Sequence, residues 1–165
     1  MDSIPLNLIN KKGKDMNRIN KNDYYLNIAL AVSKRSTCLK RHYGAVIVKN
    51  DEIVATGYNG AARNEQNCCD IYTECPRKSV KHNSGDYSDC PAVHAEQNAL
   101  ISVSRDKAIG ATLYLNGYDI DVMENIVHEK EMTECVPCPI CKRMIMNAGI
   151  SKIIGPQGLV WSTKI

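Results

Sequence analysis

The residues best suited to chemistry are one histidine, one glutamate and two cysteines in two short motifs. His94 and Glu96 frame a His-Ala-Glu tripeptide, and Cys138 and Cys141 lie further along in Pro-Cys-Pro-Ile-Cys. Zinc takes imidazole and thiolate ligands readily, and three protein ligands leave a fourth position for water. Zinc lowers the pKa of that water from its far higher bulk value to about 7, and a nearby carboxylate can carry its proton. We therefore expect His94, Cys138 and Cys141 to hold a catalytic zinc, with Glu96 as proton shuttle.

Each motif alone has a simpler explanation. A His-x-Glu tripeptide occurs often by chance, and a Cys-x-x-Cys pair is often half of a structural zinc site or a redox pair. In this order, and with Pro137 before the first cysteine, the two motifs match the signature of zinc nucleobase deaminases. Apolar residues at helical spacing after Glu96, and Pro139 at a favoured first helical position, predict two helices that begin beside the metal. Their N-terminal dipoles would favour the thiolate form of both cysteines.

Composition sets modest bounds. A chain of 165 residues with 44% apolar side chains fits one domain with one core. The net charge of +3 is not by itself the footprint of a nucleic-acid-binding protein. No apolar run reaches the roughly 18 residues of a membrane span, and the N-terminus lacks the apolar segment of a signal peptide. Eight cysteines without such a signal favour metal binding in a reducing cytoplasm over disulfides.

The pattern divides the chain into a polar tail and one domain. Residues 1–21 lack periodicity and are predicted to be a flexible tail, either solvated or a basic arm for nucleic acid, and residues 22–165 form the domain. Asn22 or Asp23 can cap the first helix. The other predicted elements are strands 45–49 and 52–56 around an Asn-Asp turn, a Cys-rich loop 59–93, the helix after Glu96, a strand 112–115, an irregular acidic segment 117–137, the helix from Pro139 and a strand 152–155. Alternating strands and helices predict a layered α/β domain.

From about residue 23 to 155 the chain resembles the deoxycytidylate (dCMP) deaminases of the cytidine deaminase-like superfamily. Besides the zinc motifs, the resemblance rests on Cys-Leu-Lys-Arg-His-Tyr-Gly-Ala-Val-Ile-Val from Cys38, Gly-Tyr-Asn-Gly from Gly57 and Gly-Ala-Thr-Leu-Tyr from Gly110. It implies a three-layer α/β/α fold with a mixed sheet of about five strands. It also implies hydrolysis of dCMP to dUMP and ammonia, which supplies dUMP for thymidylate synthesis. Asn59 would then contact the deoxyribose, and Ala95 would lie in the substrate site.

The resemblance further implies an oligomer under nucleotide control. Relatives are often hexamers with a residue matching Arg105 at a subunit contact. They are activated by dCTP and inhibited by dTTP, in many cases with magnesium. This chain departs from the family in two places, because Ala62 replaces a usual proline and the segment between Tyr114 and Pro137 is longer. A lid over the pocket is one hypothesis for the acidic stretch Asp119–Glu134 within that segment.

The remaining cysteines predict a second metal. Four thiolates in the first half of the chain could close a structural zinc site, and the resemblance places the first two in such a site. Cys69 is an alternative to Cys68, His82 could replace one thiol, and free buried thiols are the simpler alternative. Cys135 could compete with Cys138 but is expected at the lip of the catalytic site. The four predicted ligands of the structural zinc are Cys38, Cys68, Cys75 and Cys90.

The zinc motif does not choose the substrate. A tRNA adenosine deaminase, another cytidine-type deaminase and a non-catalytic zinc-stabilised module are all alternatives. The Gly57 loop with its Cys-rich insertion resembles the nucleotide branch, and the weak net charge fits a small substrate better than nucleic acid. A purely structural site would not need Glu96. The candidate phosphate contacts are Lys40, Arg41, Arg63 and Lys142.

Overall fold

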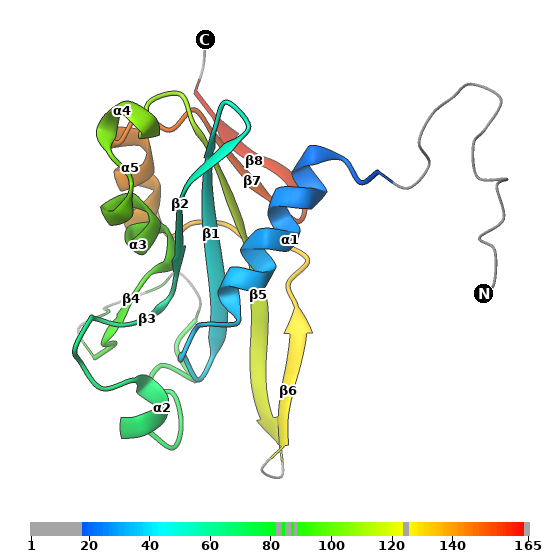
Figure 1. Ribbon diagram of the computed structural model, residues 1–165. Coiled ribbons are helices and arrows are strands. Elements are labelled where there is room, and N and C mark those ends of the chain that lie inside the picture. Colours follow the sequence, from blue (N-terminus) through cyan, green and yellow to red (C-terminus); the bar gives the residue numbers. More distant parts are fainter. Residues whose placement is uncertain (1–17, 82–83, 85–86, 88, 124–125, 164–165) are drawn as a thin grey trace, which may run out of the picture.

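A mixed six-stranded sheet forms the centre of the protein in the computed structural model, which describes residues 18–81, 84, 87, 89–123 and 126–163 (Figure 1). The strand order is β2-β1-β5-β7-β8, and β6 pairs with the far part of β5. Only the β5–β7 pair is parallel among these described pairs. The strands are β1 (Arg41–Lys49), β2 (Glu52–Tyr58), β5 (Thr112–Met123), β6 (Ile126–Glu131), β7 (Lys152–Gly155) and β8 (Gly158–Ser162).

Helices cover both faces of this sheet. Helix α1 (Lys21–Ser33) packs on one face, where its Ala29 meets Val46. Helices α3 (Ala95–Ser102) and α5 (Pro139–Asn147) and the short α4 (Arg105–Ala108) lie on the other (Figure 1). Alternate residues of β1 serve the two layers, since Ala45 and Ile47 join the α3–α5 core while Val46 faces α1. The predicted α/β/α layering is confirmed, and the sheet has one strand more than the expected five.

The predicted hairpin between β1 and β2 is confirmed. Lys49 pairs with Glu52, and the two turn residues, Asn50 and Asp51, have φ values of 50° and 69°. Two consecutive left-handed residues are typical of a type I′ turn, which asparagine and aspartate tolerate well. The hydroxyl of Tyr25 donates to Asp51, so α1 also holds this turn.

The first helix begins earlier than predicted. Asn20 caps α1, because its side-chain oxygen accepts the N–H of Asp23 at 2.9 Å. Asn22 and Asp23 are therefore helical residues, and their predicted capping role was wrong. Lys21 also belongs to the helix, so the predicted tail boundary at residue 21 is late. Residues 1–17 of the predicted tail, including its possible role as a basic arm for nucleic acid, lie outside the described residues.

The segment 117–137, expected to be irregular, is largely a two-stranded ribbon. β5 continues to Met123, and β6 returns antiparallel to it, with Tyr118 opposite Glu131. Figure 1 shows this ribbon extending beyond the rest of the sheet. All six residues of β6 are exposed, so the strand has no buried face and no period-two pattern to reveal it.

The Cys-rich loop 59–93 contains three short elements. These are β3 (Gly60–Ala61), α2 (Cys68–Ile71) and β4 (Ala92–Val93). Gly60 pairs with Val93 in an antiparallel ladder. Asn59 and His94 each lie one residue beyond this pair, so the ladder brings their segments together. No helix in the described part of the chain is long and apolar enough to cross a membrane.

Candidate active site

Helices α3 and α5 begin next to each other, with a metal-ligating residue at each start. His94 is the N-cap of α3, and Cys138 is the N-cap of α5. The Nδ1 atom of His94 lies 3.6 Å from Cys138 Sγ and 3.3 Å from Cys141 Sγ. Tetrahedral zinc with Zn–N of about 2.0 Å and Zn–S of about 2.3 Å needs an N···S separation of about 3.6 Å. The three ligand atoms therefore fit one zinc ion.

The local sequence explains why these residues converge. Pro139 occupies the start of α5, where its missing N–H costs nothing, and the Cys138 sulfur accepts the Cys141 N–H at 3.4 Å. At α3, the His94 N–H donates to the Gln97 side chain at 2.9 Å. Both predicted helix starts are confirmed. Within the described ranges, His94, Cys138 and Cys141 form the one group of three or more potential ligands whose atoms all lie within 4.8 Å.

The two sulfurs and the imidazole share protons. The pKa of Cys138 is lowered, because its sulfur accepts a hydrogen bond from Cys141 and another from His94. The pKa of Cys141 is raised by the same hydrogen bond, in which it is the donor, and by burial. The hydrogen bond to Cys138 also raises the pKa of His94. A cation that enters this group displaces these protons and binds the two thiolates.

Glu96 lies in the first turn of α3 and is buried at the same site, with 5% of its surface exposed. Burial raises the pKa of its carboxyl, and a backbone hydrogen bond at Glu96 and the charge of nearby His94 partly oppose this rise. A carboxyl with a raised pKa can both accept and return a proton near neutral pH.

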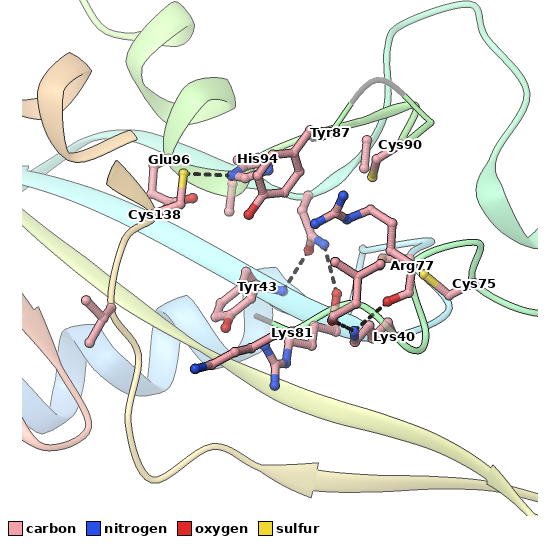
Figure 2. Close-up of a pocket in the computed structure, with 17 residues that line it drawn as sticks. Lys40, Tyr43, Cys75, Arg77, Lys81, Tyr87, Cys90, His94, Glu96 and Cys138 are labelled. Carbon is pink, nitrogen blue, oxygen red and sulfur yellow. Dashed lines mark hydrogen bonds between the residues drawn. The ribbon is translucent and has the colours of Figure 1, made fainter. Parts of the chain in front are cut away.

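A cavity opens from this group (Figure 2). Both predicted substrate residues, Asn59 and Ala95, line it. The amide of Asn59 is fixed to β1, since its oxygen accepts the Tyr43 N–H at 2.7 Å and its nitrogen donates to the Arg41 carbonyl at 2.8 Å. The predicted phosphate contacts divide, because Lys40 and Arg41 line the cavity whereas Arg63 and Lys142 are outside its lining.

Seven lining residues were not predicted from the sequence, and four of them are aromatic or charged: Tyr43, Arg77, Lys81 and Tyr87. The Tyr87 ring meets the His94 ring edge-on, with centroids 5.4 Å apart, and the Arg77 guanidinium lies 4.1 Å from the Tyr87 centroid. Tyr43 was predictable, because the period of two along β1 places it on the same face as Ala45. Arg77, Lys81 and Tyr87 come from an irregular loop, and no pattern in the sequence marks them.

Cys135 is not at the lip of the site. It is fully buried in the α3–α5 core, and its thiol lies 3.6 Å from the sulfur of Met132. Burial raises its pKa to about 12, so it stays a neutral thiol. This position leaves Cys138 as the ligand in the metal group.

The four cysteines expected to hold a second zinc lie near one another but do not form a ligand group as tight as the first. Burial raises the pKa of Cys68 to about 11, with further contributions from Cys38, Cys90 and Cys75. Three of them, Cys38, Cys75 and Cys90, line the cavity. Cys69, the alternative ligand, is exposed, and His82 lies outside the described residues. All eight cysteines are free thiols.

The α/β/α layers, with this metal group and its buried carboxylate at one end of the helices, are those of a zinc-dependent hydrolytic deaminase. Comparison with known proteins agrees. Residues 19–155 match the family model described as the cytidine and deoxycytidylate deaminase zinc-binding region. The chain belongs to this family.

Individual relatives give the same result. A deoxycytidylate deaminase of Mycobacterium phage D29 is 34% identical over 148 residues, which cover 86% of this chain and 98% of that protein. The Saccharomyces cerevisiae deoxycytidylate deaminase is 34% identical over 138 residues, covering 81% of this chain but 36% of that longer protein. The crystal structure of the cyanophage S-TIM5 dCMP deaminase in complex with dCMP and dUMP matches with a TM-score of 0.56 and 26% identity, over 84% of this chain and 83% of that one.

Proposed function

We propose that this protein hydrolyses dCMP to dUMP and ammonia, and so supplies dUMP for thymidylate synthesis. The observation that carries the chemistry is the His94–Cys138–Cys141 group, which fits one zinc ion and lies beside buried Glu96 at a cavity. The similarity to deoxycytidylate deaminases from phages and yeast supports the choice of substrate.

Zinc, when bound to these ligands, makes a coordinated water acidic enough to act as a nucleophile at neutral pH. Glu96 takes a proton from the attacking water and passes it to N3 of the ring. It then takes the second proton and passes it to the leaving amine. The C4–O bond forms and the C4–N bond breaks, so ammonia leaves and the uracil ring remains. The raised pKa of Glu96, caused by burial, suits a group that must hold each proton between transfers.

The sugar lies against β1 in this proposal. Asn59 is held rigidly by two hydrogen bonds to the β1 backbone, and its second amide hydrogen remains to meet a deoxyribose hydroxyl. Ala95 is fully buried at the start of α3 and lines the cavity, so its small side chain leaves room for the base.

Ammonia release from dCMP, CMP, deoxycytidine, dCTP and a tRNA anticodon stem-loop tests this proposal. We expect dCMP to be the preferred substrate. The Glu96→Gln variant keeps the shape but cannot shuttle protons, so it should lose roughly 100-fold or more in kcat while it keeps its zinc. Preference for another substrate would keep the deaminase chemistry and change the substrate that we assign. Undiminished turnover in a zinc-loaded Glu96→Gln protein would refute the mechanism.

The structural zinc stays part of the proposal. The pKa of the Cys68 thiol is raised by burial and further by the nearby thiols of Cys38, Cys90 and Cys75, which places the four close together. A metal held by them would order a polar loop that has little apolar surface. Metal analysis should find two zinc ions in each chain. Cys90→Ser should lose one of them and lower the melting temperature, and a single zinc in the unaltered protein would contradict this assignment.

We also propose a cytoplasmic homohexamer activated by dCTP and inhibited by dTTP, with magnesium bound to the effector. Eight free thiols fit a reducing compartment. Arg105 is exposed and bonds the Asn147 carbonyl at 3.2 Å, so it is available at the surface near α5. Sedimentation gives the assembly, and initial rates with each effector and magnesium give the regulation. A monomer indifferent to both nucleotides would contradict this part.

A further inference from the structure

Lys40 holds a turn of the Cys-rich loop against the cavity. Its ammonium donates to the backbone carbonyls of Arg77, Lys78 and Val80 at 2.7, 3.2 and 2.9 Å. The Val80 N–H closes the same turn onto the Arg77 carbonyl at 3.1 Å. An ammonium has three donors, and all three are engaged here. Lys40 is therefore not a phosphate ligand, contrary to the sequence-based expectation, but the support of residues 77–81.

The turn places cationic groups at the cavity. Arg77 and Lys81 from the turn both line it, and so does Arg41 of β1. Figure 2 shows Lys81 on the far side of the cavity from His94, Glu96 and Cys138. Lys81 is exposed and has no acidic partner among the described residues. The outer end of the cavity therefore carries positive charge away from the metal group.

Arg41 has a donor that nothing in the described chain satisfies. Its Nε bonds the Asp119 carboxylate at 2.7 Å, while its buried Nη1 atom has no hydrogen-bond partner in the described ranges. Buried donors are normally paired, so a missing partner points to a ligand. Glu96 is the one acidic residue in the lining, and it belongs to the metal end.

Building on the proposed function, we propose that the turn 77–81, supported by Lys40, gives the enzyme its preference for nucleotides over nucleosides. Lys81 contacts the 5′-phosphate from the turn, and Arg41 contacts it from β1. Lys40 is a positioning residue that acts through the turn. A phosphate carries about 1.5 to 2 negative charges at neutral pH, so it matches this end of the cavity, whereas a nucleoside leaves it unused.

The test measures kcat and KM for dCMP and for deoxycytidine in the same protein. In Lys81→Ala, kcat/KM for dCMP should fall roughly 10- to 100-fold, mostly through KM, because one charged hydrogen bond is lost. The value for deoxycytidine should stay within about twofold, since that substrate never meets Lys81. Lys107→Ala removes the same charge from exposed α4 and should leave both values unchanged.

Lys40→Met should produce the same selective loss by releasing the turn, and Lys40→Arg should restore part of it, because a guanidinium can still donate to carbonyls. If Lys40→Met does not fold, exposed Lys81 still decides the question. Equal losses for both substrates, or an unchanged dCMP value in Lys81→Ala, would overturn the inference and leave the deamination intact. A wild-type protein inactive on both substrates would instead overturn the proposed function.

Discussion

Replacing Gly57 with alanine should displace the helix that carries the active site. Gly57 lies in β2 against α3, and a methyl group there would come within 3 Å of backbone atoms of Ala95, Asn98 and Ala99. The most distant of these, the Asn98 carbonyl carbon, would be 2.9 Å away, whereas ordinary contacts begin at 3.4 Å. Backbone atoms cannot rotate aside, so α3 must move away from the sheet by about 1 Å to clear all three.

This shift reaches the chemistry because α3 starts with His94 and carries Glu96 in its first turn. A misplacement of about 1 Å in a reacting group can cost roughly 100-fold in rate. Overpacking also costs about 1–3 kcal/mol of stability, which lowers the melting temperature of a domain of this size by roughly 2–12 °C. We expect Gly57→Ala to show both effects, with a fall in kcat of about 100-fold in the folded fraction.

Gly44→Ala is the matched control. A methyl group at Gly44 would come even closer to backbone atoms, 2.0 Å from the Ala29 oxygen and 2.6 Å from the Ser33 nitrogen, but these belong to α1 on the opposite face of the sheet. Gly44→Ala should lose at least as much stability while the folded fraction keeps its kcat. Ammonia release at a temperature well below both melting transitions, with zinc content measured in parallel, separates the two variants. A folded Gly57→Ala protein with wild-type kcat would refute the reasoning.

Three further outcomes are expected. Cys138→Ser should lose the catalytic zinc and turnover. Cys135→Ser should keep stoichiometric zinc, because Cys135 packs in the core. Metal analysis that shows the reverse would exchange the roles of the two cysteines. Tyr87→Ala should weaken zinc binding about 2- to 10-fold by removing the ring that packs against His94. Tyr87→Phe keeps the ring and should bind zinc as tightly as the unaltered protein. Competition with a chromogenic chelator measures the zinc affinity of both variants. Burial lowers the pKa of His42, so the unfolded chain gains a proton below about pH 6.5 that the folded chain resists. The free energy of unfolding should therefore fall as the pH drops from 7 to 5, and the slope should be shallower in His42→Gln; identical slopes would exclude His42 as the cause.

Elements set by neighbouring residues could be predicted from the sequence. Asn50 and Asp51 tolerate the left-handed backbone of a hairpin turn, and they define the β1–β2 turn. Pro139 marks the start of α5 because its ring favours the first helical position. The metal group follows from the same local rules, since each of its motifs lies at a helix start.

Elements that depend on distant partners could not be predicted in this way. β6 is recognised by its pairing with β5 and has no buried face, so its sequence resembles an exposed loop. β8 was missed because Gly158, at a φ of 101°, ends a turn whose following strand is short and partly exposed. Lys81 lies at the cavity at the end of the turn 77–81, which Lys40, far earlier in the sequence, holds through the carbonyls of Arg77 and Val80.

Asn59 combines a role in substrate binding, expected from the local motif, with a role in holding the fold. The motif around it suggested a substrate contact, whereas the structure shows that its amide joins two backbone groups of β1. Removing that amide would therefore disturb the strand as well as the sugar contact. A loss of activity in Asn59→Ala alone would not separate the two roles, and the melting temperature must be measured with it.

The distribution of charge along the cavity links the proposed reaction to the proposed selectivity. At the inner end, two thiolates would balance one zinc ion, so Glu96 is the one acidic residue left in the cavity lining, and burial favours its neutral form. At the outer end, Asp119 pairs with Arg41, and Lys81 has no acidic partner in the part of the chain that the structure describes. An uncharged base joined to an anionic phosphate matches both ends at once. A free base would leave the outer end unused, and a ligand with an anionic ring would meet Glu96.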